Sequence, residues 1–169
     1  MKVFKRIFLL LVIIVLFILF YLVNNGYLLY KDAITEKSIE DRVSELRAKD
    51  YFTSYDELPD YYKDAVICVE DHKFYDHYGI DLFYIARALI NDLKAKKAVE
   101  GGSTITQQVA KNLVFTQEKT VYRKIAELFA THDLEKNYSK KEIFELYVNN
   151  MYFGNGYYNI HDASYRILS

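Results

Sequence analysis

The chain has 169 residues, which is room for one domain of modest size. Its formal net charge of −1 excludes the strongly basic surface typical of general nucleic-acid binders, so no nucleic-acid partner is expected. The single cysteine, Cys68, excludes an internal disulfide. Because it lies within an apolar run, Cys68 is predicted to be a small buried side chain without thiol chemistry.

The first element is an apolar stretch that can cross a membrane. A basic flank precedes the uncharged run Ile7–Val23, which is close to the ~20 residues that a spanning helix needs, and Asn24-Asn25-Gly26 closes it. The flank predicts a cytoplasmic N-terminus and an external remainder. A cleaved signal peptide is the rival interpretation, but the run exceeds the usual ~7–15 apolar residues, so a retained anchor is favoured. The predicted divisions are a tail (1–6), an anchor (7–27), a stalk or linker (28–57) and an external domain (58–169). The charged segment Lys31–Lys49 within the stalk could instead form the first turns of the external domain.

The external domain is predicted to be all-α, since no segment shows convincing strand alternation. Pro59 marks the start of a helix that ends near Glu70. Asp81 caps the next helix, whose apolar stripe includes Leu82 and Leu93 and is expected to face a core. Further helix starts are indicated by capping residues before apolar spacing, at Ser103 or Thr104, at Thr120, and at the capping box of Ser139 and Glu142.

A dense polar stretch surrounds one of these helix starts. Gly101 and Gly102 permit a sharp turn, and a helix start offers free N–H groups and a positive dipole end. Anionic oxygens suit such a place, although a solvated, well-capped surface helix fits the pattern equally well. The polar candidates are Ser103, Thr104, Thr106, Gln107, Gln108, Lys111 and Asn112.

Two carboxylates are candidates for chemistry. Glu70 ends an apolar helix beside aromatic residues, where burial would favour a role in proton transfer. Glu127 follows Arg123 by four residues, so the two can pair on one helix face, either as a surface ion pair or as a carboxylate held near cations. His72 and His77 match no standard zinc spacing, and structural hydrogen bonding is the favoured interpretation of both.

Four motifs occur in order and together resemble the family 51 peptidoglycan glycosyltransferases, found as monofunctional enzymes and as the N-terminal domain of class A penicillin-binding proteins. The resemblance extends from about Pro59 to Ile160. The motifs are Glu70-Asp71-x-x-Phe74-x-x-His77-x-Gly79, Gly101-Gly102-Ser103-Thr104-Ile105-Thr106-Gln107-Gln108, Arg123-Lys124-x-x-Glu127 and Glu145-x-Tyr147-Val148-Asn149.

The resemblance implies a membrane-anchored, lysozyme-like all-α domain that polymerises lipid II outside the cell membrane into β-1,4-linked glycan strands with inversion. It implies that Glu70 is the general base and that Glu127 assists at the pyrophosphate, alone or through Mg or Mn; no tightly bound cofactor is expected. It implies lipid II, the growing glycan chain and the membrane as partners, with cell-wall assembly proteins as further candidates. The substrate-binding residues would be Ser103, Thr104, Gln107, Gln108, Lys111, Asn112, Lys119, Arg123 and Lys124, with Gly154 and Gly156 as structural positions.

The sequence also departs from the family pattern. Lys119 stands where arginine is usual, Ala126 where a lysine commonly precedes the glutamate, and Asn159 where a glycine is usual. If position 159 needs a positive φ, asparagine is the best-tolerated substitute. The family continues beyond the position of Ser169, which predicts a C-terminally incomplete domain. The alternative function is therefore a weak or inactive tethered homologue that binds lipid II or assembly partners, and a third is the front end of a bifunctional protein. No Ser-x-x-Lys transpeptidase motif occurs in the chain.

Overall fold

The structure of the protein is a computed structural model that describes residues 2–95, 101–115 and 120–167. All regular structure among these residues is helical, with no strand, which confirms the all-α prediction. The helices are α1 (Lys2–Glu36), α2 (Ile39–Arg47), the 3-10 turn η1 (Tyr55–Glu57), α3 (Asp60–Glu70), α4 (Leu82–Ala95), α5 (Ile105–Val114), α6 (Val121–Asn137), α7 (Lys140–Asn149) and α8 (Ile160–Ile167).

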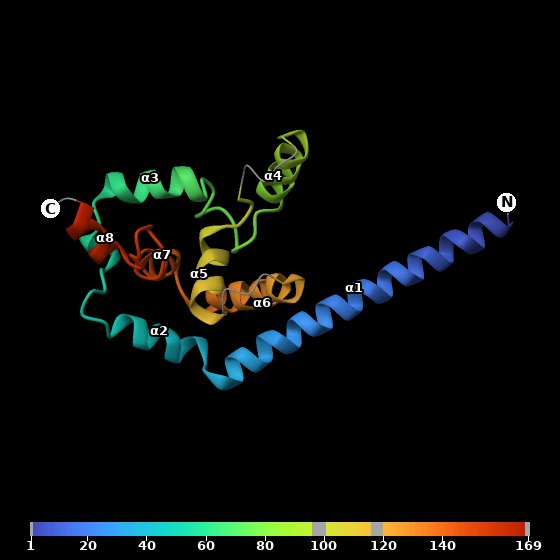
Figure 1. Cartoon of the computed structure of the whole chain (residues 1–169), viewed down its shortest axis with the longest axis horizontal. Helices are drawn as coiled ribbons and strands as arrows, with labels where there is room; N and C mark the ends of the chain where they lie inside the picture. The colour runs from blue at the N-terminus through green and yellow to red at the C-terminus, as the bar shows by residue number, and fades with distance from the viewer. Residues whose placement is uncertain (1, 96–100, 116–119, 168–169) are drawn as a thin grey trace.

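The core lies where α5, α6 and α7 meet (Figure 1). Ile105 of α5, Leu134 of α6 and Phe144 of α7 are fully buried there. Helices α2 and α3 lie on either side of this centre, and α4 stands apart from it. The three central helices have capping residues at the predicted positions, with Thr104, Thr120 and Ser139 each accepting a backbone N–H. Local capping therefore places the helix starts, and apolar faces then bring the helices together.

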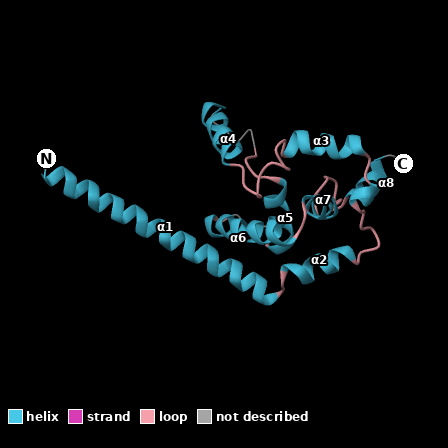
Figure 2. Ribbon diagram, turned by 180° about the vertical axis from the view of Figure 1, so that it is seen from behind, coloured by secondary structure: helices cyan, strands magenta, loops and turns pink. Residues whose placement is uncertain are grey.

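Helix α1 is one continuous helix that projects far beyond the domain (Figure 2). The apolar residues of its first half are exposed, and the helix is long and apolar enough to span a membrane. The apolar run closes at Asn24-Asn25-Gly26, but the helix continues beyond these residues to Glu36 and packs along α6. The packed segment satisfies its backbone within the helix and buries its apolar side against α6, so the break residues do not terminate it.

Helix α2 lies inside the segment predicted as a stalk. Ile39, Val43 and Leu46 are buried in the core, at the i, i+4, i+7 spacing of a helix face. Ser38 caps the helix by accepting the N–H of Asp41. Residues 39–47 therefore pack into the core of the domain, as the alternative interpretation of Lys31–Lys49 expects.

Several apolar side chains of α3 and α4 that were expected to be buried are exposed. Cys68 of α3 is exposed, so its predicted burial was wrong, and Val69 beside it is 76% exposed. Tyr62, Val66 and Ile67 are the apolar residues of α3 that pack against the core. Leu82 and Leu93 of α4 are also exposed, because α4 stands away from the central helices.

The chain after α7 turns at Gly154-Asn155-Gly156, where all three residues have a positive φ. The glycines there are needed for that backbone, since other residues resist it. Asn159 does not have a positive φ; it caps α8, with its Oδ1 accepting the N–H of Asp162 at 2.8 Å. The substitution of asparagine for glycine at this position thus has a structural role in this chain.

Candidate active site

The start of α5 is the centre of the candidate site. Thr104, not Ser103, is the N-cap: its hydroxyl accepts the N–H of Gln107 at 3.1 Å and donates to the carbonyl of Gly79 at 2.6 Å. The side chain of Gln107 accepts the N–H of Thr104, which completes a capping box. Thr104 and Gln107 are buried and already bonded to the protein, so they shape the helix start from within.

Asp71 fastens the end of α3 to the start of α5. Its carboxylate accepts the N–H of Ile105 at 3.1 Å and contacts His77 Nε2 at 2.9 Å. This bond satisfies one of the free N–H groups at the helix start, and a carboxylate there is favoured by the helix dipole. His77 therefore has a structural hydrogen bond, as the sequence predicted. Gly79 completes the motif with φ +76°, and a Cβ there would lie 2.5 Å from Thr131 Cγ2.

Glu70 is the last residue of α3 and is half-buried. Its Oε2 accepts a hydrogen bond from Gln108 Nε2 at 2.9 Å. Gln108 lies one turn into α5, so the capped helix presents this amide to the carboxylate. Burial raises the pKa of the Tyr147 phenol on α7, and the nearby negative charge of Glu70 raises it further.

Glu127 is fully buried on α6 and is held by two cations. Arg123 Nη1 hydrogen-bonds to Oε1, which confirms the predicted pairing across one turn. Lys124 Nζ lies 3.0 Å from Oε2, where its charge acts without a hydrogen bond. Lys124 Nζ also donates to Ser103 Oγ at 2.8 Å, so the cluster reaches the loop before α5.

Helix α5 thus contacts both carboxylate environments. Gln108 touches Glu70, and the residue before its N-cap, Ser103, touches the cluster around Glu127. Lys111 is half-buried and follows Gln108 by three residues, so the two are neighbours on the helix surface.

Asn112 donates to the carbonyl of Asn150 at 3.1 Å, which ties α5 to the end of α7. Lys119, a predicted phosphate contact, lies outside the described residues.

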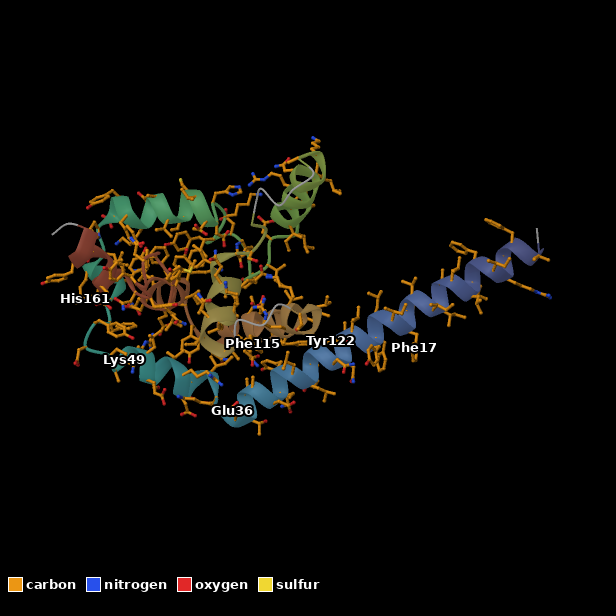
Figure 3. All side chains as sticks on the ribbon, viewed as in Figure 1. Phe17, Glu36, Lys49, Phe115, Tyr122 and His161 are labelled. Atoms are coloured by element: carbon orange, nitrogen blue, oxygen red, sulfur yellow. The ribbon has the colours of Figure 1, made fainter. Side chains whose placement is uncertain are left out.

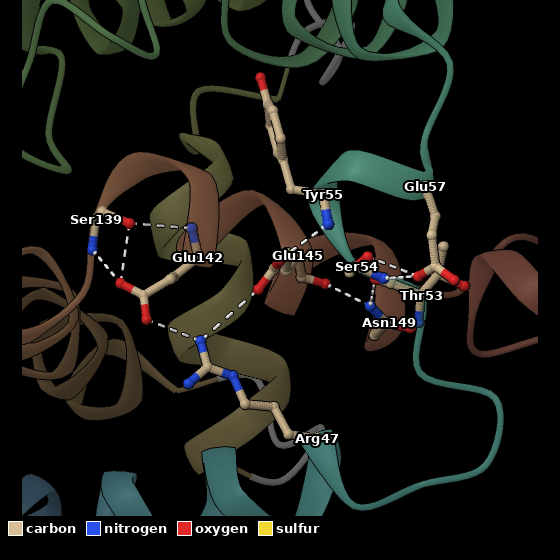
Figure 4. Close-up of polar contacts among 9 residues, drawn as sticks. All are labelled: Arg47, Thr53, Ser54, Tyr55, Glu57, Ser139, Glu142, Glu145 and Asn149. Carbon is tan, nitrogen blue, oxygen red and sulfur yellow. Dashed lines mark hydrogen bonds and ion pairs between the residues drawn. The ribbon is translucent and has the colours of Figure 1, made fainter.

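The fourth motif has a structural network around it (Figure 4). The Asn149 side chain pairs with both the N–H and the carbonyl of Thr53, at 2.8 and 2.7 Å. Glu145 accepts the N–H of Tyr55 at 2.8 Å and lies 3.7 Å from Arg47. These bonds fix the segment before α3 to α7. The motif therefore supports the N-terminal end of α3, the helix that ends in Glu70.

The remaining motif residues divide between core and surface. Phe74 and Tyr147 are buried, and Phe74 packs near Phe144. Gly101 is exposed, and a Cβ at this position would meet no other described part of the chain within 4 Å, so space does not require a glycine there. Among the described residues, no three His, Cys, Asp or Glu side chains are grouped to hold a metal ion.

Sequence reasoning missed two parts of this arrangement. Arg47 of α2 joins the network of Glu145, and the helical spacing of Ile39, Val43 and Leu46 was the signal that could have decided between a stalk and the first turns of the domain. The link between Asp71 and the N–H of Ile105 had no signal, because the two are 34 residues apart in the chain.

Comparison with known proteins agrees with this arrangement. The transglycosylase family model matches residues 36–168. Monofunctional glycosyltransferases of Staphylococcus aureus strains Newman, Mu3 and COL are each 45% identical over 130 residues, covering 75% of this chain and 48% of the relative. The chain therefore spans about half the length of the curated relatives it matches. The family match covers α2 to α8, including both candidate carboxylates, and accounts for the predicted lysozyme-like all-α architecture. On these grounds, the chain belongs to the transglycosylase family.

Proposed function

We propose that this protein is a membrane-anchored peptidoglycan glycosyltransferase that polymerises lipid II into β-1,4-linked glycan strands. The observation that carries the proposal is that two carboxylates with different surroundings both lie beside α5. Glu70 has a neutral amide for a partner, whereas Glu127 is buried between two cations. Transfer at a sugar–pyrophosphate bond needs both kinds of group, a base for the incoming hydroxyl and cations for the departing anion.

In the proposed reaction, Glu70 takes the proton from the 4-hydroxyl of the incoming lipid II sugar. The freed oxygen attacks the anomeric carbon of the growing chain from the face opposite the leaving group, which inverts the configuration. The bond from that carbon to the pyrophosphate oxygen breaks, and its electron pair leaves with the polyprenyl pyrophosphate. The hydrogen bond from Gln108 orients Glu70 for the proton transfer.

The leaving pyrophosphate would bind at the cluster of Arg123, Lys124 and Ser103. Arg123 Nε is buried without a hydrogen-bond partner among the described residues, and a phosphate oxygen would supply one. Lys124 is half exposed and remains accessible from solvent. A divalent metal fits here only through the pyrophosphate oxygens, because both oxygens of Glu127 already contact cations; bound there, it would neutralise phosphate charge.

The placement at a membrane is part of the proposal. Helix α1 is long and apolar enough to span a bilayer, and its basic N-terminal flank favours a cytoplasmic N-terminus with the domain outside. Leu82, Phe83 and Leu93 of α4 are exposed, which suits contact with a membrane surface. A lipid-linked substrate is consistent with both features, and cell-wall assembly proteins are candidate partners.

The test is polymerisation of labelled lipid II by the full chain in detergent, compared with Glu70→Gln. Loss of the general base is expected to lower the rate by about 10²–10⁴-fold. Asp64→Asn is the matched control, because Asp64 is an exposed carboxylate on the same helix. Equal rates for the parent and Glu70→Gln would contradict the assignment of the base. Binding of lipid II without turnover by the parent would favour the tethered homologue instead.

A further inference from the structure

Helix α1 joins the apolar run to the domain without a flexible segment. It is helical from Lys2 to Glu36, and its second half packs along α6, the helix that carries Glu127 (Figure 1). In Figure 3, Tyr122 lies beside α1, whereas Phe17 lies on the part of α1 that projects away from the domain. The anchor and the candidate site are therefore connected by one rigid element.

Gly26 lies at a close approach between α1 and α6. It is buried, and a Cβ at this position would lie 2.5 Å from Ile125 Cγ2 and 3.2 Å from the carbonyl oxygen of Tyr122. Real Cβ atoms essentially never make a contact as short as the one to Ile125, so a larger residue at position 26 would push the helices apart. Glycine at position 26 thus permits the packing of α1 against α6.

Contacts on both sides of Gly26 fix the register. Tyr21 meets Tyr122 edge to face with centroids 6.4 Å apart, and Tyr27 meets Phe129 at 5.3 Å. Tyr30 also stacks on Phe129 and donates a hydrogen bond to Asp133, one turn farther along α6. Because later residues of α1 meet later residues of α6, the helices run parallel, and α6 begins at the end nearer the apolar run.

This register fixes the level of the candidate site along α1. Glu127 lies between Ile125 and Phe129 on α6, which meet Gly26 and Tyr27–Tyr30 on α1. At a rise of ~1.5 Å per residue, that level is about 5–10 Å beyond Val23, the last residue of the apolar run, measured along the axis of α1. The headgroup region on each side of a bilayer is roughly 5–8 Å thick. A lipid-linked pyrophosphate would lie at this level.

We propose that Gly26 and the register it permits make α1 a rigid support, which holds the Arg123–Glu127 cluster at headgroup height. Gly26 is then a positioning residue for the site, acting through α6. The inference rests on the membrane-bound reaction proposed above, and it adds that the anchor determines where the site meets the substrate. A flexible tether would only keep the domain near the membrane and would leave this height unspecified.

The test measures the depth of α6 in lipid vesicles with a nitroxide or fluorescent label and lipid quenchers at known depths. The label is placed at Val121→Cys, an exposed position at the start of α6, in a Cys68→Ser background. An Ala-Gln-Ala-Gln insertion between Asn24 and Asn25 adds about 6 Å to the helix between the apolar run and Gly26. The label is expected to move about 4–6 Å away from the bilayer centre.

The matched control is the same insertion between Glu36 and Lys37, beyond the contact with α6, and it should leave the depth unchanged. An unchanged depth with the first insertion, or equal shifts with both, would overturn the inference. Failure of the parent to float with vesicles would overturn both the inference and the proposed membrane placement. The expected depth shift in a protein that makes no polymer would uphold α1 as a rigid support while contradicting the proposed reaction.

A second measurement uses Gly26→Ala, with Asn24→Ala on the exposed side of the same helix as its control. With a long-chain substrate embedded in vesicles, Gly26→Ala is expected to raise KM several-fold. With a short-chain, water-soluble analogue it should match the parent, because the height of the site above the membrane then has no effect. An equal loss with both substrates would indicate general damage to the fold and contradict the positioning role.

Discussion

Glu70 and Glu127 both lie beside α5, but their surroundings differ in burial and in charge. Glu70 is half-buried, and it accepts a hydrogen bond from the neutral amide of Gln108. Glu127 is fully buried, and its two oxygens contact Arg123 and Lys124. A neighbouring cation favours the charged form of a carboxylate, so a proton acceptor is better placed away from one. This difference is what the proposed function requires, with proton transfer at Glu70 and charge organisation at Glu127.

The largest expected difference between the two carboxylates is in stability. Glu127→Gln leaves two cations near a buried neutral side chain, and losing one partner of a buried ion pair costs about 3 kcal/mol. Glu70 forms no ion pair with any described residue, so Glu70→Gln should change the free energy of unfolding by less than about 1 kcal/mol. Urea unfolding of the two variants in detergent, followed by circular dichroism, measures both. Equal unfolding free energies would remove the distinction between the sites.

Two adjacent glutamines sharpen the comparison. Gln108→Leu removes the hydrogen bond to Glu70 and is expected to lower the polymerisation rate about tenfold, which is the value of ~1.4 kcal/mol in the barrier. Gln107→Leu instead breaks the capping box and leaves the N–H of Thr104 without its partner, so it should cost about 1–3 kcal/mol of stability. Rate and unfolding measurements on both variants test this division, and a reversed pattern would contradict it.

The features that sequence predicted well are those set by local spacing. Thr104, Thr120 and Ser139 cap helices as expected, because a cap needs only its own side chain and an N–H three residues away. The pair of Arg123 and Glu127 is likewise within one helical turn. Patterns of this range are complete within a few residues, so tertiary structure does not alter them.

The features that the sequence did not predict depend on which element packs against a given helix face. The apolar stripe of α4 was predicted to face a core and Cys68 of α3 to be buried, yet Leu93 and Cys68 are exposed. Periodicity shows that a face is apolar, but it carries no information about which element covers it. The packing of Gly26 on Ile125 is a contact across about a hundred residues, and one glycine after an apolar run gives no sign of it.

A smaller effect is expected at the exposed cation of the Glu127 cluster. Lys124→Gln should change stability by less than about 1 kcal/mol, because the lysine is half exposed. It should raise KM for lipid II several-fold, by removing a charge from the proposed pyrophosphate site, and added salt should reduce the difference from the parent. Lys136→Gln, at the exposed far end of α6, is the matched control. Equal KM values for the two variants would separate Lys124 from substrate binding.

The smallest effect concerns Glu142, a partly exposed carboxylate that contacts neither Glu70 nor Glu127. The backbone N–H of Ser139 and then Arg47 hold the pKa of Glu142 below its ordinary value. A group with a depressed folded pKa stabilises the protein above its unfolded pKa of ~4.3 and loses that contribution as pH falls through the folded pKa. Glu142→Gln should therefore be less stable than the parent at pH 7, by under about 1 kcal/mol, and the difference should shrink below pH ~4. Urea midpoints of both proteins from pH 7 to pH 3 measure it. A difference that persists at pH 3 would mean that the Glu142 side chain stabilises the protein through packing and not through its charge.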